Sequence, residues 1–303
     1  MNPEPVNRGH YAGSVRSRDG IWSDVEVAVP RPSVRLPGIR MAGFSQRGTA
    51  LWDIDMVAHP SVTLLVDLSD GGGAVYDCHG RRQHGSVAIG LVPGDLRAAG
   101  RARVECLQIR LEPVRAAAVL GASAELSGAV VPLREVWGSG ADRFEDRLRA
   151  AASWDERFQV AADALALRLG DGPAVDPEVA HVWRRTLAGR GRVRVDRLAD
   201  DVGWSRKRLW ARFRSQLGIS PKRAARLVRF DHAAHLLAAG RAPAGVAGDS
   251  GYVDQSHLHR EVMAFAGRTP AAVAEAPWLA IDDVAWPAAP RSARAVARDR
   301  QQW

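Results

Sequence analysis

One pattern occurs twice in the last third of this sequence, and the repeat limits what the chain can fold into. Residues 198–205 (LADDVGWS) match residues 246–253 (VAGDSGYV) at an offset of 48 residues. After a one-residue insertion the offset becomes 49 residues. The positions that then correspond are Leu209 and Leu258, Phe213 and Val262, Gly218 and Gly267, and Pro221 and Pro270. Each copy predicts a helix, a glycine turn, a second helix and a closing Gly-x-[Ser/Thr]-Pro.

The residue types at the matched positions indicate two helix-turn-helix units in tandem. Gly203 and Gly251 allow the positive φ that a tight corner between two helices needs, and an aromatic residue follows each of them. Ser205 and Asp254 are suited to cap the helix that comes next. The stretch 224–239 between the copies predicts a helix that spans over about 20 Å, enough to set two recognition helices in successive major grooves. A plain helical bundle is the alternative interpretation.

The net charge of +8 belongs almost entirely to the same region. Residues 174–276 contain 18 basic and 10 acidic side chains, whereas residues 1–173 contain 20 and 21. A concentration of positive charge is typical of a protein that binds a polyanion, although a solvated basic surface has the same composition. Together with the repeat, the charge predicts binding to double-stranded DNA.

The segments 198–221 (LADDVGWSRKRLWARFRSQLGISP) and 251–270 (GYVDQSHLHREVMAFAGRTP) resemble the AraC/XylS family of bacterial transcription regulators. The resemblance covers about 100 residues. It implies a cupin-like N-terminal effector domain, a helical dimerisation segment and activation through contact with RNA polymerase. Repression is the other possible mode of regulation.

The two recognition helices each offer an outward face for base contacts. The side chains expected to reach base edges in the major groove are Arg206, Lys207, Trp210 and Ala211 in the first unit, and Gln255, Ser256, His259 and Arg260 in the second. The side chains expected to hold phosphates are Arg208, Arg212, Arg214, Lys222 and Arg223. For any one of these residues, a phosphate contact or simple solvation is the alternative.

The first half of the chain predicts a β-rich domain. Short apolar runs at 61–68, 86–92 and 103–111 alternate with turn clusters, as in a compact barrel or sandwich. From residue 141 to 169 the period changes to that of two amphipathic helices, broken near Ser153. The predicted fold is therefore α+β with two domains: a β-rich cupin-like domain (1–140), a helical hairpin and linker (141–173) for dimerisation, an all-α tandem helix-turn-helix domain (174–276) and a poorly ordered tail (277–303).

The chemistry of the N-terminal domain is sparse. A small organic effector in the barrel is the favoured hypothesis, with Trp22, Arg40, Trp52 and Arg110 as weak lining candidates. His59, Cys78, His79, His84 and Cys106 could converge on a metal, but this domain has no His-x-His run followed by Glu on one strand, so we expect no metal and no cofactor. A redox role for Cys78 or Cys106 stays open.

These observations predict a sequence-specific transcription regulator that is controlled by an effector or by dimerisation. In one alternative the N-terminal domain is only a protein–protein scaffold. In another the chain is a DNA-repair enzyme fusion, but two cysteines cannot supply the four-cysteine zinc site of that type. We expect no enzymatic activity. The chain has no apolar run of membrane-spanning length, and its cysteine content favours the cytoplasm.

Overall fold

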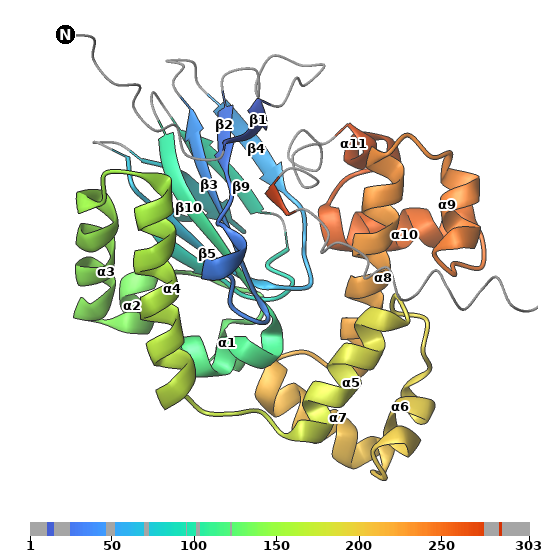
Figure 1. Ribbon diagram of the computed structural model, residues 1–303. Coiled ribbons are helices and arrows are strands. Elements are labelled where there is room, and N and C mark those ends of the chain that lie inside the picture. Colours follow the sequence, from blue (N-terminus) through green and yellow to red (C-terminus); the bar gives the residue numbers. More distant parts are fainter. Residues whose placement is uncertain are drawn as a thin grey trace, which may run out of the picture.

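The computed structural model describes residues 11–14, 25–46, 52–69, 73–94, 96–100, 104–121, 123–275 and 285–286 of the chain. A β-rich part covered by helices lies beside a cluster of helices formed by the last third of the sequence (Figure 1). This confirms the predicted fold class, in which β structure comes first and an all-α tandem repeat follows.

Two antiparallel sheets make up the β-rich part within the described residues. One has the strand order β1-β2-β3-β10-β5-β8-β11 and the other β4-β9-β6-β7. The strands are β1 (Tyr11–Ser14), β2 (Val25–Ala28), β3 (Ile39–Gln46), β4 (Trp52–Met56), β5 (Val62–Asp67), β6 (Val75–Cys78), β7 (Arg81–His84), β8 (Val87–Ile89), β9 (Leu96–Gly100), β10 (Val104–Leu111) and β11 (Val130–Pro132).

Strand β5 has an apolar sequence that does not alternate with polar residues, because both of its faces are covered. Leu64 and Val66 pack into the large cluster that includes the helices, whereas Leu65 packs into the cluster between the two sheets. A strand that is covered on both faces buries every side chain, and all six residues of β5 are buried. The run at 61–68 is thus a central strand.

A helical layer packs on the first sheet, and its elements come after β10 in sequence, with β11 between the second and the third of them. Ser153 begins the last of these helices by accepting a hydrogen bond from the backbone N–H of Glu156 at 3.3 Å, at the break that the sequence predicts. The sequence did not predict the shorter elements before residue 139. The elements are α1 (Pro113–Leu120), the 3-10 helix η3 (Ser123–Leu126), α2 (Leu133–Trp137), α3 (Ser139–Ala150) and α4 (Trp154–Asp171).

The repeat region forms the second cluster of helices. Its elements are α5 (Pro177–Ala188), α6 (Val195–Asp201), α7 (Arg206–Leu217), α8 (Pro221–Ala238), α9 (Pro243–Asp249), α10 (Gln255–Ala266) and α11 (Pro270–Ala274). Helix α8 packs against both α7 and α10, and it therefore joins the two copies into one body.

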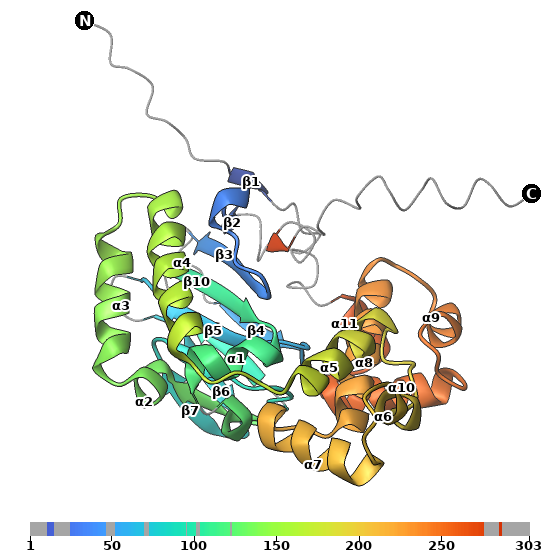
Figure 2. The same cartoon turned by 60° about the horizontal axis from the view of Figure 1, so that its bottom comes forward.

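The two parts of the molecule share a hydrophobic core. One cluster of buried side chains runs from Leu64 and Leu107 in the sheet through Leu148 in the helical layer to Leu209 and Leu258 in the repeat. Helix α7 contacts α1 and η3 at the junction. Figure 2 shows α7 below α1. The N-terminal part is thus packed directly on the first repeat unit.

No helix in the described ranges is long and apolar enough to cross a membrane. In the tail that was expected to be poorly ordered, Ala285 and Trp286 are described, and both are buried against β2 and β3 residues.

Candidate nucleic-acid interface

Both copies of the repeat fold as helix-turn-helix units of the same construction. Helices α6 and α7 meet at Gly203, and helices α9 and α10 meet at Gly251, with φ angles of 64° and 75°. Residues with a Cβ rarely adopt these angles, so the matched glycines define the corner.

The aromatic residue after each glycine packs into the corner between the two helices. Trp204 and Tyr252 are both buried, and their backbone N–H groups donate to Ala199 O at 3.0 Å and to Ala247 O at 2.8 Å. Each hydrogen bond lies within one copy, and the two bonds occur at corresponding positions of the repeat.

The N-caps of the recognition helices are the ones that the sequence predicts. Ser205 Oγ accepts a hydrogen bond from the backbone N–H of Arg208 at 3.2 Å, and Asp254 Oδ1 accepts one from that of His257 at 2.6 Å. Each cap satisfies an N–H group that has no partner within its helix.

The Gly-x-[Ser/Thr]-Pro sequence ends one helix and begins the next in each copy. Gly218 and Gly267 lie in the left-handed region at the ends of α7 and α10. Ser220 and Thr269 then cap α8 and α11, with cap distances of 3.3 Å and 3.2 Å. We refer to residues 218–221 and 267–270 as the first and second closing turns.

Each recognition helix has a buried back and an exposed polar face. Leu209, Phe213, Leu258 and Val262 are buried, as the repeat predicts. The eight residues predicted to contact bases are all exposed: Arg206, Lys207, Trp210 and Ala211 on α7, and Gln255, Ser256, His259 and Arg260 on α10. The structure therefore brings together each predicted set on one helix face.

Trp210 is the most distinctive of these side chains because it is large, apolar and 48% exposed. The guanidinium of Arg214 lies 5.2 Å from the centre of its ring. In contrast, Trp183 and Trp204 are buried. An exposed tryptophan on a recognition helix is available for apolar contact with a thymine methyl group or a sugar.

All five predicted phosphate-binding side chains are exposed, namely Arg208, Arg212, Arg214, Lys222 and Arg223. Arg208 lies over the Trp204 ring, 4.5 Å from its centre. Helix α8 begins directly before Lys222 and Arg223, and its 18 residues span about 27 Å between the two units.

Arg212 differs from the other predicted phosphate-binding residues because a carboxylate already holds it. Its Nε and Nη2 donate to Asp176 at 2.7 Å and 2.8 Å, just before α5 begins. These hydrogen bonds lower the pKa of the Asp176 carboxyl. In this structure Arg212 therefore ties α7 to α5.

Glu261 is a residue that the sequence reasoning missed. This buried carboxylate on α10 accepts hydrogen bonds from Arg226 at 2.7 Å and Arg229 at 3.2 Å, both from α8. The Arg229 guanidinium also lies 5.0 Å from the ring centre of Tyr252, whose pKa is raised by burial and by the nearby Glu261. The cluster fixes the second recognition helix on α8.

The β-rich part contains a largely apolar cavity of about 160 Å³ between its two sheets. Arg110 and His59 supply cationic and imidazole nitrogens to its wall, with Arg110 Nη1 and His59 Nε2 3.2 Å apart. Trp286 also lines the cavity, and the Arg110 guanidinium lies 4.2 Å from its ring centre.

Two of the four effector candidates, Arg40 and Arg110, have side chains within the described residues. Arg110 lines this cavity, whereas Arg40 is exposed and lines a neighbouring hollow that Arg110 and Trp286 also border. Trp22 and the side chain of Trp52 lie outside the described residues.

The cysteines occupy different settings. The Cys78 thiol donates to Pro93 O at 3.1 Å, and Cys106 lines the cavity, where burial raises the pKa of its thiol. Because the thiolate is the reactive form, burial opposes redox chemistry at Cys106. Among the described residues, no three His, Cys, Asp or Glu side chains gather as a metal ion would require.

The solved structures that this chain resembles share little of its sequence. ToxT from Vibrio cholerae O395 is 8% identical, with a TM-score of 0.45 over 79% of this chain and 98% of that chain. Unsaturated fatty acid-bound ToxT from Vibrio cholerae strain SCE256 is 8% identical, with a TM-score of 0.43 over 80% and 96%. The AraC-like transcriptional activator CuxR is 12% identical, with a TM-score of 0.32 over 67% and 80%.

No curated protein sequence matches the chain. A family model described as a helix-turn-helix domain matches residues 198–276, which contain both turns, both recognition helices and the helix between them. Residues 198–276 are therefore a helix-turn-helix domain of the AraC type, and the chain that carries them is a DNA-binding transcription regulator.

Proposed function

We propose that this regulator reads two successive major grooves with α7 and α10, and that an effector in the β-rich part controls the reading. The observation that carries the first half of the proposal is the matched pair of exposed polar helix faces with buried backs. Arg206, Lys207 and Arg260 suit guanine, and Gln255 suits adenine. Residues 174–276 are the reading domain, and residues 1–140 the sensing domain.

The effector hypothesis is supported by the cavity between the sheets. A dry cavity of similar volume in another protein accommodates benzene, so a molecule with about one ring fits here. Arg110 and His59 offer nitrogens to a polar group on that molecule. His59 Nε2 is also 3.9 Å from Asp231 of α8, so an occupant can influence the helix that joins the reading units.

Strand β4 provides a second connection between the cavity and the reading domain. Ile54 and Met56 line the cavity, whereas the alternate residues Asp53 and Asp55 make ion pairs outside it. Neighbouring side chains of a strand point to opposite faces but share one backbone, so a shift of β4 moves both sets. One of these ion pairs joins Asp55 to Arg268 of the reading domain.

Dimerisation through α3 and α4 is part of the proposal. Leu167 on α4 is a large apolar side chain that is 68% exposed, and the proposal places it in the dimer interface. Light scattering of the wild-type chain and of Leu167→Glu measures the association. We expect a dimer that the substitution converts to a monomer; a wild-type monomer with and without DNA would contradict this part.

The test of sequence-specific reading is a selection of bound duplexes from a random DNA pool with the full chain. We expect two half-sites whose centres are about one helical turn apart. Recovery of unrelated sequences would contradict specific reading. Promoter-dependent transcription with purified RNA polymerase then distinguishes an activator from a repressor.

The effector hypothesis is tested by the thermal stability of the chain with a panel of small metabolites. A ligand that binds the native state raises Tm, and Ala98→Phe, which fills the cavity, should abolish that rise. The unliganded melting curve of Ala98→Phe is the control for folding. If no compound raises Tm, the alternative of a protein–protein scaffold is favoured.

A further inference from the structure

The two closing turns place positive charge differently. In the first turn Ile219 is buried, and the exposed pair Lys222 and Arg223 follows the proline. In the second turn Arg268 occupies the position of Ile219, and alanines occupy the positions of the basic pair. The second copy therefore has two fewer cationic side chains after the turn than the first copy, and one more within it.

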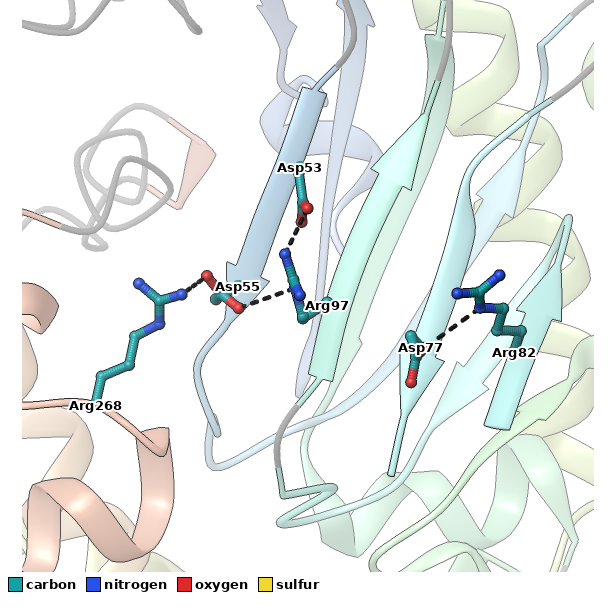
Figure 3. A network of polar contacts seen from close by, with 6 residues as sticks. All are labelled: Asp53, Asp55, Asp77, Arg82, Arg97 and Arg268. Atoms are coloured by element: carbon teal, nitrogen blue, oxygen red, sulfur yellow. Dashed lines mark hydrogen bonds and ion pairs between the residues drawn. The ribbon is translucent and has the colours of Figure 1, made fainter. Parts of the chain in front are cut away.

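Both closing turns also touch the N-terminal part of the molecule. A Cβ on Gly218 would lie 2.3 Å from Ala124 O of η3, so the first turn packs closely against that element. At the second turn, the Arg268 guanidinium donates from Nη2 to the Asp55 carboxylate of β4 (Figure 3). Equivalent turns of the two units are thus attached to the sensing domain by different means.

Asp55 is shared between two arginines. Arg97 of the neighbouring strand β9 lies with Nε 3.5 Å from Asp55 and with Nη2 2.5 Å from Asp53 (Figure 3). If Arg268 leaves, Asp55 keeps Arg97 and does not become a solitary carboxylate. The Arg268 side chain is 45% exposed, so its release does not uncover a buried charge either. This ion pair can therefore open at low cost.

We propose that Arg268 is a DNA-phosphate contact of the second unit, and that Asp55 occupies its guanidinium until DNA displaces it. In the second copy Arg268 makes the phosphate contact that Lys222 and Arg223 are predicted to make in the first copy. A carboxylate and a phosphate present the same kind of acceptor to a guanidinium, so the two compete for one group. The proposal rests on DNA binding by the tandem units and adds a residue and an internal competitor to it.

The experiment measures the affinity of the full chain for a mixed-sequence DNA duplex at several salt concentrations. In Asp55→Asn the competitor is removed, and we expect affinity to rise about two- to fivefold, the equivalent of one exposed ion pair. The plot of log affinity against log salt should also steepen, by up to about 0.9 for one additional phosphate contact.

Asp53→Asn is the matched control, because it removes the same charge from the same strand without touching Arg268. It should change affinity less than Asp55→Asn does. A second, more distant control is Asp77→Asn, whose carboxylate pairs with Arg82 in the hairpin of β6 and β7 (Figure 3). Melting curves verify that all three variants fold.

A double substitution isolates the role of Arg268. If the gain arises from Arg268, Arg268→Gln in the Asp55→Asn background returns both the affinity and the salt slope to near the wild-type values. A gain that survives Arg268→Gln, or equal gains in Asp55→Asn and Asp53→Asn, would overturn the proposal. Failure of the wild-type chain to bind any duplex would instead reject the function on which it rests.

Discussion

The two helix-turn-helix units share a skeleton and differ in what holds each recognition helix. Arg212 of the first unit and Glu261 of the second occupy matching positions, 49 residues apart. Arg212 is exposed and pairs with Asp176 before α5, whereas Glu261 is buried and accepts from two arginines of α8. The same position thus connects each helix to a neighbour, but with opposite charge and opposite burial.

This difference shows which features of a duplicated unit are constrained. The turn glycines, the caps and the buried apolar residues recur because the corner and the helix ends require them. The charged residue that attaches the helix depends on a partner elsewhere, so it can change sign when the partner changes. The difference also predicts that the second unit depends more on its ion pair than the first does.

The largest effect is expected for Glu261→Ala. Removal of the carboxylate leaves Arg226 and Arg229 without their shared acceptor, and breaking a buried pair from one side costs about 3 kcal/mol or more. Urea unfolding with an unchanged m-value would report this loss of unfolding free energy. Arg212→Ala is the matched control and should lose less than about 1 kcal/mol. Equal losses in the two variants would contradict the comparison.

A smaller effect is expected at the closing turn of the first unit. Gly218 has a φ of 75°, and a Cβ there would meet Ala124 O at 2.3 Å, so Gly218→Ala should cost about 2 to 3 kcal/mol. Gly203→Ala is the control, because Gly203 has a φ of 64° but nothing lies within 4 Å of its added Cβ. It should cost only the left-handed strain of about 1 kcal/mol. Thermal unfolding separates the two; a larger loss at Gly203 would argue against tight docking on η3.

The next prediction concerns what each unit contributes to binding. Arg260→Ala on α10 should relax specificity at one base pair and cost about 1 to 3 kcal/mol on the selected operator. Lys222→Ala at the start of α8 should weaken binding evenly on specific and random duplexes. Mobility-shift titrations of both variants on both duplexes measure the difference. Equal losses on specific and random DNA for both variants would refute this division of roles.

The sequence was sufficient for features that recur at regular spacing. The corner glycines, the caps and the buried faces of α7 and α10 could be predicted because two aligned copies confirm each other. The central strands β5 and β10 could be predicted from apolar runs. In these elements the determinants lie within a few residues of one another.

Long-range pairs could not be predicted in the same way. Arg268 and Asp55 are 213 residues apart, and neither copy of the repeat indicates that β4 lies beside the second closing turn. For Glu261 a signal did exist, because Leu258 and Phe265 place residue 261 on the buried face of a helix. A carboxylate at such a position requires cationic partners, and Arg226 and Arg229 on the preceding helix were candidates.

The smallest predicted effect is the pH dependence of the tie between α7 and α5. Hydrogen bonds from Arg212 lower the pKa of Asp176 below its ordinary value of 3.8. The pair therefore stabilises the fold above the pH at which Asp176 ionises in the unfolded chain, and this contribution is lost as the pH falls through the lower, folded-state pKa. Because the Arg212 side chain is half exposed, solvent screening keeps the contribution below about 1 kcal/mol. Denaturant unfolding between pH 5 and pH 3 should show a slightly shallower decline in Asp176→Asn than in the wild type. Asp249→Asn is a suitable control, since its carboxylate pairs with Arg241 on the second unit and leaves α5 untouched. A decline in Asp176→Asn as steep as that of the wild type would show that this carboxylate does not link the first recognition helix to α5 in solution.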